Sequence, residues 1–420
     1  MDSTDIFTQA LGLSAPWRVE RTSFIKGDTG SKELHIYIGF EAGSKFVIGG
    51  SEPLPVHDTI DRSWRHLNFF EHRCYLHARV PRVRTSEHEM HMVEVPWARP
   101  KSGFTLLFEA YAMFLIEEET PVSGVAKVVK ETAPRIWRIF KHWVGKAVDK
   151  IDMSGLRLVG VDETSKRKGH DYITQFVDLE ARKTVFVTEG RGMDTFERFR
   201  NRLLACGGKV ENIEAISMDM SPSFIAGAMT YFPNAGIIFD KFHLFSALNQ
   251  ALDRVRKQEH EQTRLLKGQK YTFLHLRKHL PQSKQATLDT LLLTYPTIGK
   301  AYGFRESFFD IFSADIYEPD PEGKLKQWCK AVAESAIAPM VAFANMVKTH
   351  MYGIRTLLAN KDINNGILEG LNSLIQLAKR RARGYANVDN FIAGGLLHYR
   401  QDETRLPTGN VIDPKKSMTM

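Results

Sequence analysis

The sequence predicts an α/β protein whose core has three short antiparallel strands followed by helix, strand, helix and strand. Five apolar runs rich in β-branched residues predict the strands, at 156–161, 172–178, 183–188, 213–218 and 236–239. The short connection 178–182 predicts a hairpin. Helical spacing over 195–206 and 222–231 places helices between the last three strands. This order is typical of a ribonuclease-H-like (retroviral-integrase-like) core.

Two carboxylates directly follow strands of this core, and a third lies on a later helix. Asp162 and Asp219 come at the ends of the first and fourth apolar runs, and Glu369 is in a segment with helical spacing. Carboxylate oxygens are preferred ligands of Mg²⁺ and Mn²⁺, and two such ions can activate a water or a 3′-hydroxyl and stabilise the leaving oxygen of a phosphodiester. The set predicts metal-dependent phosphoryl transfer with two ions per site.

Each of these carboxylates also has an ordinary structural interpretation. Asp219 could belong to a turn, although Ser221 before Pro222 already supplies a helix N-cap. Glu369 taken alone could be a solvated helix residue. Two secondary candidates follow the last strand. Asp240 could be a metal ligand, and His243 could position the scissile phosphate or cap the next helix.

Two helices are predicted before the core, at 121–130 and from Pro134 to about 148. In the second helix the apolar residues share one side, and basic residues are expected on the other: Arg135, Arg138, Lys141, His142 and Lys146. This pattern predicts a helix-turn-helix whose second helix lies in the major groove of DNA. A plain amphipathic helix pair is the alternative.

A strand-rich module is predicted upstream, with arginines between aromatic residues. Positions 62–84 hold six arginines and one acidic residue. We expect contacts to DNA phosphates from Arg62, Arg65, Arg79 and Arg82. The alternative is a small core whose arginines only solvate its surface.

Composition favours a polyanion as partner and excludes a secreted or membrane protein. The net charge is +8 and the pI is near 9.2. The three cysteines are far apart and form no Cys-x-x-Cys pair, so we expect no disulfides. No window approaches the ~18 continuous apolar residues of a membrane span. We therefore expect a cytoplasmic, nucleoid-associated protein.

Between 244 and 360 the pattern is helical, which predicts an all-α insertion that either holds DNA or forms a dimer surface. On the Glu369 helix, the polar and basic residues expected along the DNA backbone are Asn372, Lys379, Arg380 and Arg383. The expected domains are a β-rich module, a helix-turn-helix, a two-part catalytic core, the insertion and a flexible tail, at 1–105, 106–150, 151–243 with 361–400, 244–360 and 401–420.

The motifs resemble those of bacterial insertion-sequence transposases of the ISL-three family over most of the chain. The matching segments are 159–165, 218–220, 238–243, 365–372 and 379–385, with 56–59, 63–70, 75–82 and 95–99 upstream. The resemblance implies an Asp-Asp-Glu triad of Asp162, Asp219 and Glu369 on a ribonuclease-H-like domain that binds Mg²⁺ or Mn²⁺. It also implies a homo-oligomer that binds terminal inverted repeats in double-stranded DNA, cleaves the strand and joins its end to target DNA.

The resemblance fails at one place, because relatives open with a zinc module built on two Cys-x-x-Cys pairs. The corresponding positions 46–50 and 85–88 contain no cysteine. Structural zinc sites normally use thiolates, so we expect no zinc. The module could instead be held by Trp64, Phe69, Phe70 and Trp97. Its alteration also keeps a second interpretation open, in which a domesticated, catalytically silent transposase acts as a sequence-specific DNA-binding repressor.

Overall fold

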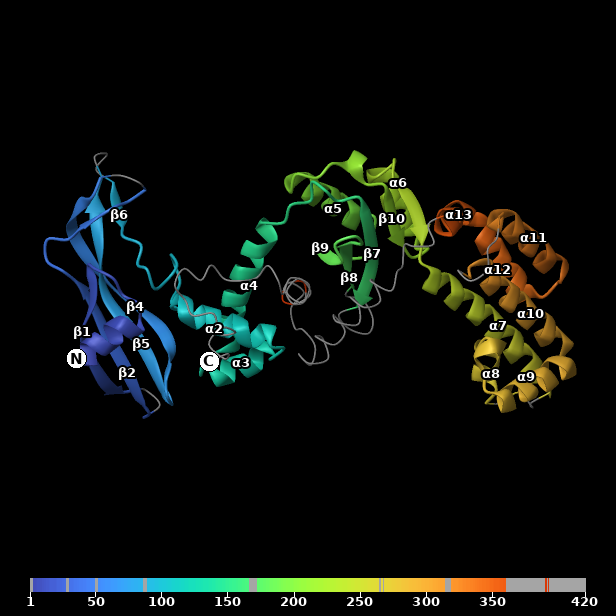
Figure 1. Ribbon diagram of the computed structural model, residues 1–420, viewed down its shortest axis with the longest axis horizontal. Coiled ribbons are helices and arrows are strands. Elements are labelled where there is room, and N and C mark those ends of the chain that lie inside the picture. The colour runs from blue at the N-terminus through green and yellow to red at the C-terminus, as the bar shows by residue number, and fades with distance from the viewer. Residues whose placement is uncertain are drawn as a thin grey trace. The chain divides into compact units, whose positions relative to one another are not determined.

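A computed structural model of the chain describes residues 3–27, 30–49, 52–85, 89–165, 172–263, 266, 268–313, 319–359, 390 and 392. The chain forms two compact units, whose main parts are Met1–Val148 and Asp149–Leu377. Each unit has its own sheet and its own helices (Figure 1).

Unit 1 begins with a short helix and a twisted sheet, which confirms the predicted β-rich module. The strands are in the order β1-β2-β5-β4-β3, with β6 beside β5. The β4 and β5 strands form a long antiparallel hairpin, and β2 runs parallel to β5. The elements are α1 (Ser3–Ala10), β1 (Trp17–Lys26), β2 (Lys32–Phe40), β3 (Lys45–Phe46), β4 (Leu54–Phe69), β5 (His72–Arg84) and β6 (Met90–Met92).

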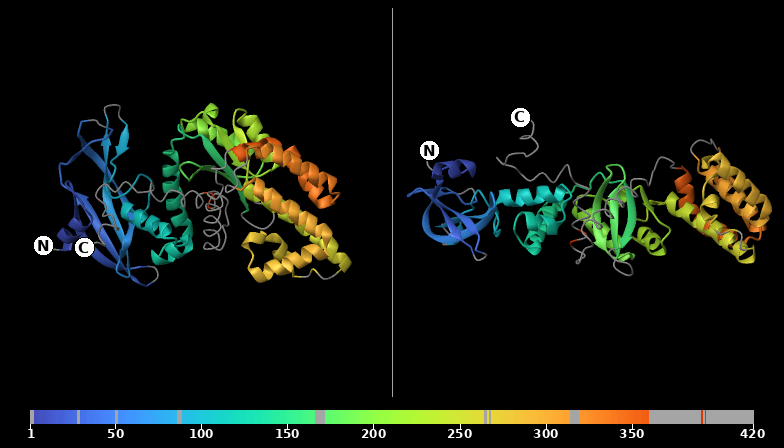
Figure 2. Two further views of the ribbon diagram at one scale, coloured as in Figure 1. Left: turned by 45° about the vertical axis from the view of Figure 1, so that its right-hand side comes forward. Right: turned by 90° about the horizontal axis from the view of Figure 1, so that it is seen from below.

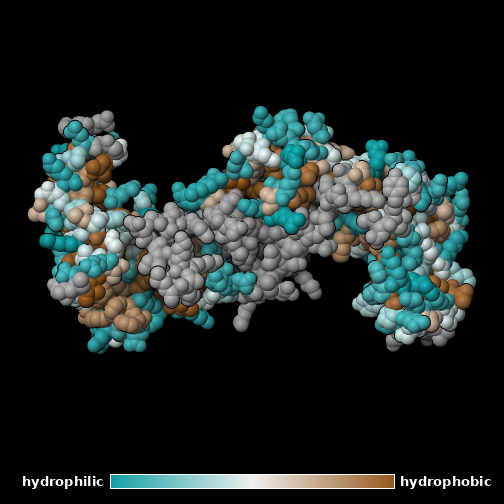
Figure 3. Space-filling view, viewed as in Figure 1, coloured by the Kyte–Doolittle hydropathy of each residue, from teal (hydrophilic) through white to brown (hydrophobic). Residues whose placement is uncertain are grey.

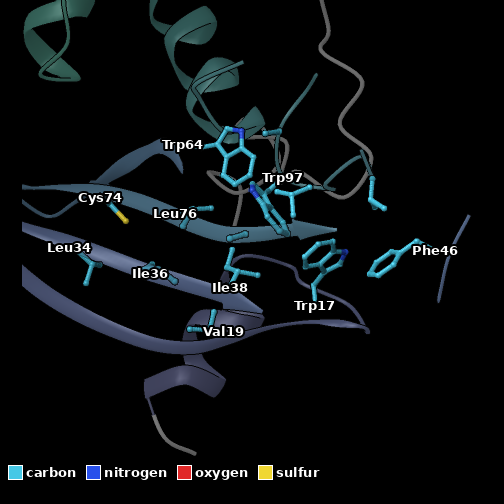
Figure 4. Packing of buried hydrophobic residues seen from close by; sticks show 14 of the residues in the cluster. Trp17, Val19, Leu34, Ile36, Ile38, Phe46, Trp64, Cys74, Leu76 and Trp97 are labelled. Carbon is cyan, nitrogen blue, oxygen red and sulfur yellow. The ribbon is translucent and has the colours of Figure 1, made fainter. Parts of the chain in front are cut away.

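Alternation along these strands builds the core of the sheet. In β2 and β5 every second side chain is buried, among them Leu34, Ile36 and Leu76. Trp97 packs edge-on against Trp17 and Trp64, with centroids 5.0 and 5.6 Å apart (Figure 4). The expected packing role of Trp64 and Trp97 is confirmed. The expectation that Phe70 packs in this core is wrong, because its side chain is 86% exposed at the β4–β5 turn, where φ is 51°.

The described part of unit 1 contains three further helices: α2 (Leu106–Glu117), α3 (Val122–Val128) and α4 (Ala133–Asp149). The predicted pair corresponds to α3 and α4, while α2 is additional. In α4 the buried residues are Ile136, Ile139, Phe140 and Val144. A fully buried carboxylate, Glu109 of α2, accepts hydrogen bonds from Arg99 (2.9 Å), Ser102 (2.6 Å) and Trp143 (2.8 Å). This network joins α2 to α4 and to the preceding loop.

Unit 2 contains a five-stranded sheet in the order β11-β10-β7-β8-β9. Strands β7, β8 and β9 are antiparallel neighbours, and β10 and β11 run parallel to β7. The predicted order of strands and helices is confirmed. The elements are β7 (Leu158–Ser165), β8 (Tyr172–Asp178), β9 (Lys183–Glu189), α5 (Asp194–Ala205), η1 (Val210–Asn212), β10 (Ala215–Met218), α6 (Pro222–Tyr231) and β11 (Gly236–Phe239).

A phenylalanine cluster attaches α5 and α6 to this sheet. Phe176 of β8 stacks on Phe199 with centroids 4.2 Å apart, and Phe196 bridges Phe176 and Phe224 at 5.3 and 5.6 Å. All four rings are fully buried. Fully burying each ring contributes roughly 1.5–3 kcal/mol, so this cluster is a main source of stability for the sheet that carries the candidate site.

The segment expected as a helical insertion follows β11 directly and is helical. The long helix α7 leads away from the sheet and packs against α10 and α12 (Figures 1 and 2). The described helices of the insertion are α7 (Lys241–Thr263), α8 (Lys270–Leu274), η2 (Arg277–His279), α9 (Gln282–Thr294), α10 (Pro296–Ile311), α11 (Pro321–Glu334), α12 (Ala338–Thr349) and α13 (Met351–Ala359). Among the described helices, none is long and apolar enough to cross a membrane.

Candidate functional site

Three aspartates occupy matching positions on or directly after three adjacent parallel strands of unit 2. Ser217 of β10 pairs with Gly160 of β7. Asp219 and Asp162 each come two residues later, so they lie level with each other. Met218 pairs with Phe239 of β11, so Asp240 is level with Asp219. The strands run in the same direction, and the three carboxylates therefore approach one edge of the sheet.

Asp162 lies inside β7, which corrects the expectation that it ends a strand. Strand β7 continues to Ser165 because β8 remains its antiparallel partner as far as Tyr172. Asp162 pairs with Gln175 of β8 and is half-buried, and its Oδ1 accepts a hydrogen bond from the Glu163 amide (2.7 Å).

Asp219 directly follows β10, as predicted, and takes part in the turn before α6. Its Oδ1 accepts a hydrogen bond from the Ser221 amide (2.9 Å). Ser221 is at the N-cap position with Pro222 as the first helical residue, but its side chain forms no capping bond. The Ser221 hydroxyl lies 3.0 Å from that of Ser223 instead. In the described hydrogen bonds, Asp219 therefore uses only Oδ1.

Asp240 and His243 are brought together at the start of α7. Asp240 is 6% exposed, and its Oδ1 accepts a hydrogen bond from the Phe242 amide (2.7 Å). Its Oδ2 lies 3.9 Å from Nε2 of His243. Asp240 therefore caps α7 through one oxygen and lies near His243 through the other.

Glu163 also lies close to this edge, although its position in the sequence does not indicate a site residue. Burial raises the pKa of Glu163 above its usual value, and the negative charge of Asp219 raises it further. Arg191 and His243 act in the opposite direction. All these groups are near enough to influence one another electrostatically, so the edge collects both acidic and basic side chains.

The third predicted triad member, Glu369, lies outside the described residues. So do Asn372, Lys379, Arg380 and Arg383. Within the described part of the chain, no three His, Cys, Asp or Glu side chains form a group that could hold one metal ion. The donor chemistry of Asp162, Asp219 and Asp240 nevertheless suits a hard divalent cation, which binds carboxylate oxygens.

In the helix-turn-helix of unit 1, the predicted basic residues have different environments. Arg138 and Lys146 are exposed, and Lys141 is half-buried. Arg135 forms an ion pair with Glu131 (2.7 Å) and lies over the ring of Phe104. Burial lowers the pKa of His142, and the positive charges of Arg99 and Lys146 lower it further, against the opposing effect of Glu109.

The arginines of the β-rich module also differ. Arg62 and Arg79 are exposed, with Arg79 donating to the Thr59 hydroxyl, and Arg82 forms a two-point ion pair with Asp58. Arg65 is only 1% exposed. The expectation that Arg65 contacts DNA is therefore corrected.

Arg65 instead joins the β-rich module to the helices within unit 1. Its guanidinium donates to the carbonyls of Cys74 (3.1 Å) and Val129 (3.2 Å), and its Nε lies 3.6 Å from Glu131. It also donates to the His66 carbonyl and to Asn68 Oδ1.

Comparison with protein families gives three matches along the chain. A family model described as transposase, of the ISL3 type with a DDE domain, matches residues 159–394. A model of the helix-turn-helix domain of transposase family ISL3 matches 93–144. The chain belongs to the ISL3 transposase family. It is an enzyme acting on DNA, and its helix-turn-helix is a DNA-binding domain, so the repressor alternative is not favoured.

Curated relatives agree with this assignment. The transposase for insertion sequence element IS1001 of Bordetella parapertussis is 26% identical over 356 residues, covering 81% of this chain and 85% of that protein. The transposase for insertion sequence element IS1557 of Mycobacterium tuberculosis is 26% identical over 381 residues, covering 82% of this chain and 83% of that protein.

A third family model, the zinc-finger of transposases IS204, IS1001, IS1096 and IS1165, matches residues 50–88 and stands against the expectation of no zinc. The donors described there do not fit a zinc site. Cys74 is the segment's one cysteine, and burial in the core raises its thiol pKa to about 12. His66 is hydrogen-bonded to Thr105 (2.9 Å), and His77 to His35 (2.8 Å). Tetrahedral zinc needs four converging donors, usually thiolates among them.

Proposed function

We propose that this transposase cleaves DNA at the ends of its insertion sequence and joins the freed 3′-hydroxyl to target DNA, with Asp162, Asp219 and Glu369 as the catalytic carboxylates. The observation that carries the proposal is the level placement of Asp162 and Asp219 on adjacent parallel strands. Two carboxylates at one sheet edge can share a divalent ion, which a protein that only binds DNA does not require.

The fold proposed for this core is ribonuclease-H-like. In support, the three antiparallel strands β7, β8 and β9 come first in unit 2, and β10 and β11 extend the sheet beside β7 in parallel. Helices α5 and α6 connect these strands in the expected order. This arrangement puts the first two carboxylates on neighbouring strands, although they are 57 positions apart in the sequence.

The carboxylates Asp162, Asp219 and Glu369 would hold Mg²⁺ or Mn²⁺. When bound, such ions lower the pKa of a water or hydroxyl and stabilise charge on the leaving oxygen of a phosphodiester. The hydrogen bond from the Ser221 amide to Oδ1 of Asp219 fixes the orientation of this carboxylate, so that Oδ2 can bind the ion. His243, whose Nε2 lies 3.9 Å from Asp240, is proposed to orient the scissile phosphate by donating a hydrogen bond, and Asp240 is proposed as a further carboxylate beside the metal ions.

DNA recognition is proposed to come from the helix-turn-helix, with α4 in the major groove of the terminal inverted repeat. Arg138 and Lys146 are exposed on α4 and are the first candidates for contacts. Arg62 and Arg79 of the β-rich module would add phosphate contacts, and Arg82 would do so only by leaving Asp58. Cleavage at two ends of one element favours a homo-oligomer on DNA.

Cleavage of a labelled duplex carrying the element's own end, with Mg²⁺ or Mn²⁺, tests the proposal. The isosteric variants Asp162→Asn, Asp219→Asn and Glu369→Gln should bind this duplex like the wild type and not cut it. Glu189→Gln removes an exposed carboxylate at the end of β9 and should cut normally. A wild type that binds the end tightly but never cuts with either metal would refute the catalytic proposal.

A further inference from the structure

The helical insertion contains a groove between α11, the end of α12 and the start of α13. Its volume is about 680 Å³, and three lysines line it: Lys326, Lys330 and Lys348. The walls also include Cys329 and Met351, with Glu334 as the one acidic lining residue. The groove therefore combines an apolar floor with a positively charged rim.

The helices around the groove are held by a well-packed core. Trp328 of α11 packs edge-on against Phe343 of α12 at 5.9 Å and against Phe308 at 4.8 Å. Cys329, which lines the groove, is fully buried, and its thiol lies 3.9 Å from the Ala344 carbonyl. The lysines thus project from a rigid support, which reduces the entropy lost when a ligand binds.

The charge of the groove is not balanced by the described residues. Lys326 is paired with Glu322 at 2.7 Å. Lys330 and Lys348 are exposed and make no ion pair within the part of the chain that the structure describes. The lining residues therefore carry three positive charges and one negative charge, that of Glu334. This excess of positive charge favours an anion as the ligand of the groove.

One helix borders both the groove and the carboxylate edge. Met351, the first residue of α13, lines the groove. Two residues later, Gly353 touches Phe239 so closely that an added Cβ would lie 2.5 Å from the ring. Phe239 directly precedes Asp240 and also contacts the rings of His350 and Tyr352, at 5.3 and 5.5 Å. Helix α13 thus contributes one residue to the groove and packs another against the strand that precedes Asp240.

We propose that the groove binds the phosphodiester backbone of DNA through Lys330 and Lys348, as a sequence-independent contact beside the carboxylate edge. Charge complementarity favours this partner, because exposed lysines over an apolar floor suit phosphates flanked by deoxyribose. The side of the insertion seen in Figure 3 is mainly hydrophilic, in keeping with a polar partner rather than an apolar one. The inference rests on the proposed function and adds a binding site to it.

The salt dependence of DNA affinity tests the groove. A labelled duplex of arbitrary sequence is titrated with the full chain and with the double variant Lys330→Ala/Lys348→Ala. Each phosphate contact contributes about 0.9 to the slope of log K against log salt, so the double variant should lose about 2 from the slope. Over a fourfold rise in salt, the wild type should then weaken about tenfold more than the variant.

A matched control removes two exposed lysines elsewhere in the insertion, Lys284→Ala/Lys300→Ala, and should leave the slope near that of the wild type. Lys330→Arg/Lys348→Arg should retain it. Equal slopes for the groove variant and the control would overturn the proposal, as would a change in oligomer mass without a change in slope. If the groove variant keeps the wild-type slope while the wild type still cuts DNA, only the groove assignment fails. If it never cuts, the proposed function fails.

Discussion

Replacing the buried Arg65 by methionine should destabilise unit 1 strongly, because this guanidinium connects segments far apart in the sequence. It donates to the carbonyls of Cys74 and Val129 and approaches Glu131 within 3.6 Å. Burial lowers the pKa of Arg65, which reflects the cost of removing its charge from water. The folded structure offsets that cost through these contacts, and Arg65→Met removes the donor that the Cys74 and Val129 carbonyls and Glu131 share.

The size of the effect follows from which contacts remain. Removing one partner of a buried ion pair costs about 3–5 kcal/mol. Glu131 retains Arg135 at 2.7 Å, so its charge stays compensated and the lower end applies, about 3 kcal/mol. With an m-value of about 2 kcal/mol per molar urea, the unfolding midpoint of unit 1 should fall by about 1.5 M.

Urea unfolding followed by tryptophan fluorescence measures this shift, because five of the six tryptophans lie in unit 1: Trp17, Trp64, Trp97, Trp137 and Trp143. The control Arg79→Met removes an exposed arginine and should change the free energy of unfolding by less than about 0.5 kcal/mol. Equal midpoints for the two variants would refute the structural role given to Arg65.

Three further predictions concern stability. Burial lowers the pKa of His66 to about 4, so the unfolded state alone takes up a proton as the pH falls from about 6.5 towards 4. Unit 1 should lose up to about 3 kcal/mol over that range, and His66→Gln should flatten the pH dependence of its urea midpoint. Glu109→Gln weakens a charged hydrogen-bond network and should cost about 2 kcal/mol in the same urea assay. Gly353→Ala forces a methyl group against Phe239 and should lower the thermal stability of unit 2 by about 1–3 kcal/mol, whereas Gly303→Ala, with open space around it, should not.

Much of the fold could be predicted because hydrophobic periodicity reports directly on which residues are buried. The strand and helix order of unit 2 follows from five apolar runs and two helical patterns. The length of β7 could not be read this way. Asp162 to Ser165 are polar, and only pairing with β8 keeps them in the strand. Helix α2 is apolar on nearly all sides, so it lacks the one-sided pattern that identified α4.

The candidate site could be predicted in part, since Asp219 and Asp240 follow apolar strands. The sequence could not show that Glu163 lies near Asp219, Arg191 and His243. This proximity depends on side chains that α7 and the loop before α5 bring to the site. Arg65 shows the same limit. Its neighbours in sequence suggest a basic surface, and only acceptors from β5 and the end of α3 make burial of its charge possible.

The most direct test of the central claim is metal rescue of cleavage at the element's end. In Asp162→Cys and Asp219→Cys, a thiolate replaces a hard oxygen ligand, which disfavours Mg²⁺ more than the softer Mn²⁺. We predict that both variants bind the duplex, fail to cut it with Mg²⁺ and regain cutting with Mn²⁺. Cutting by both variants with Mg²⁺ at the wild-type rate would contradict the claim that these two residues hold the catalytic ion.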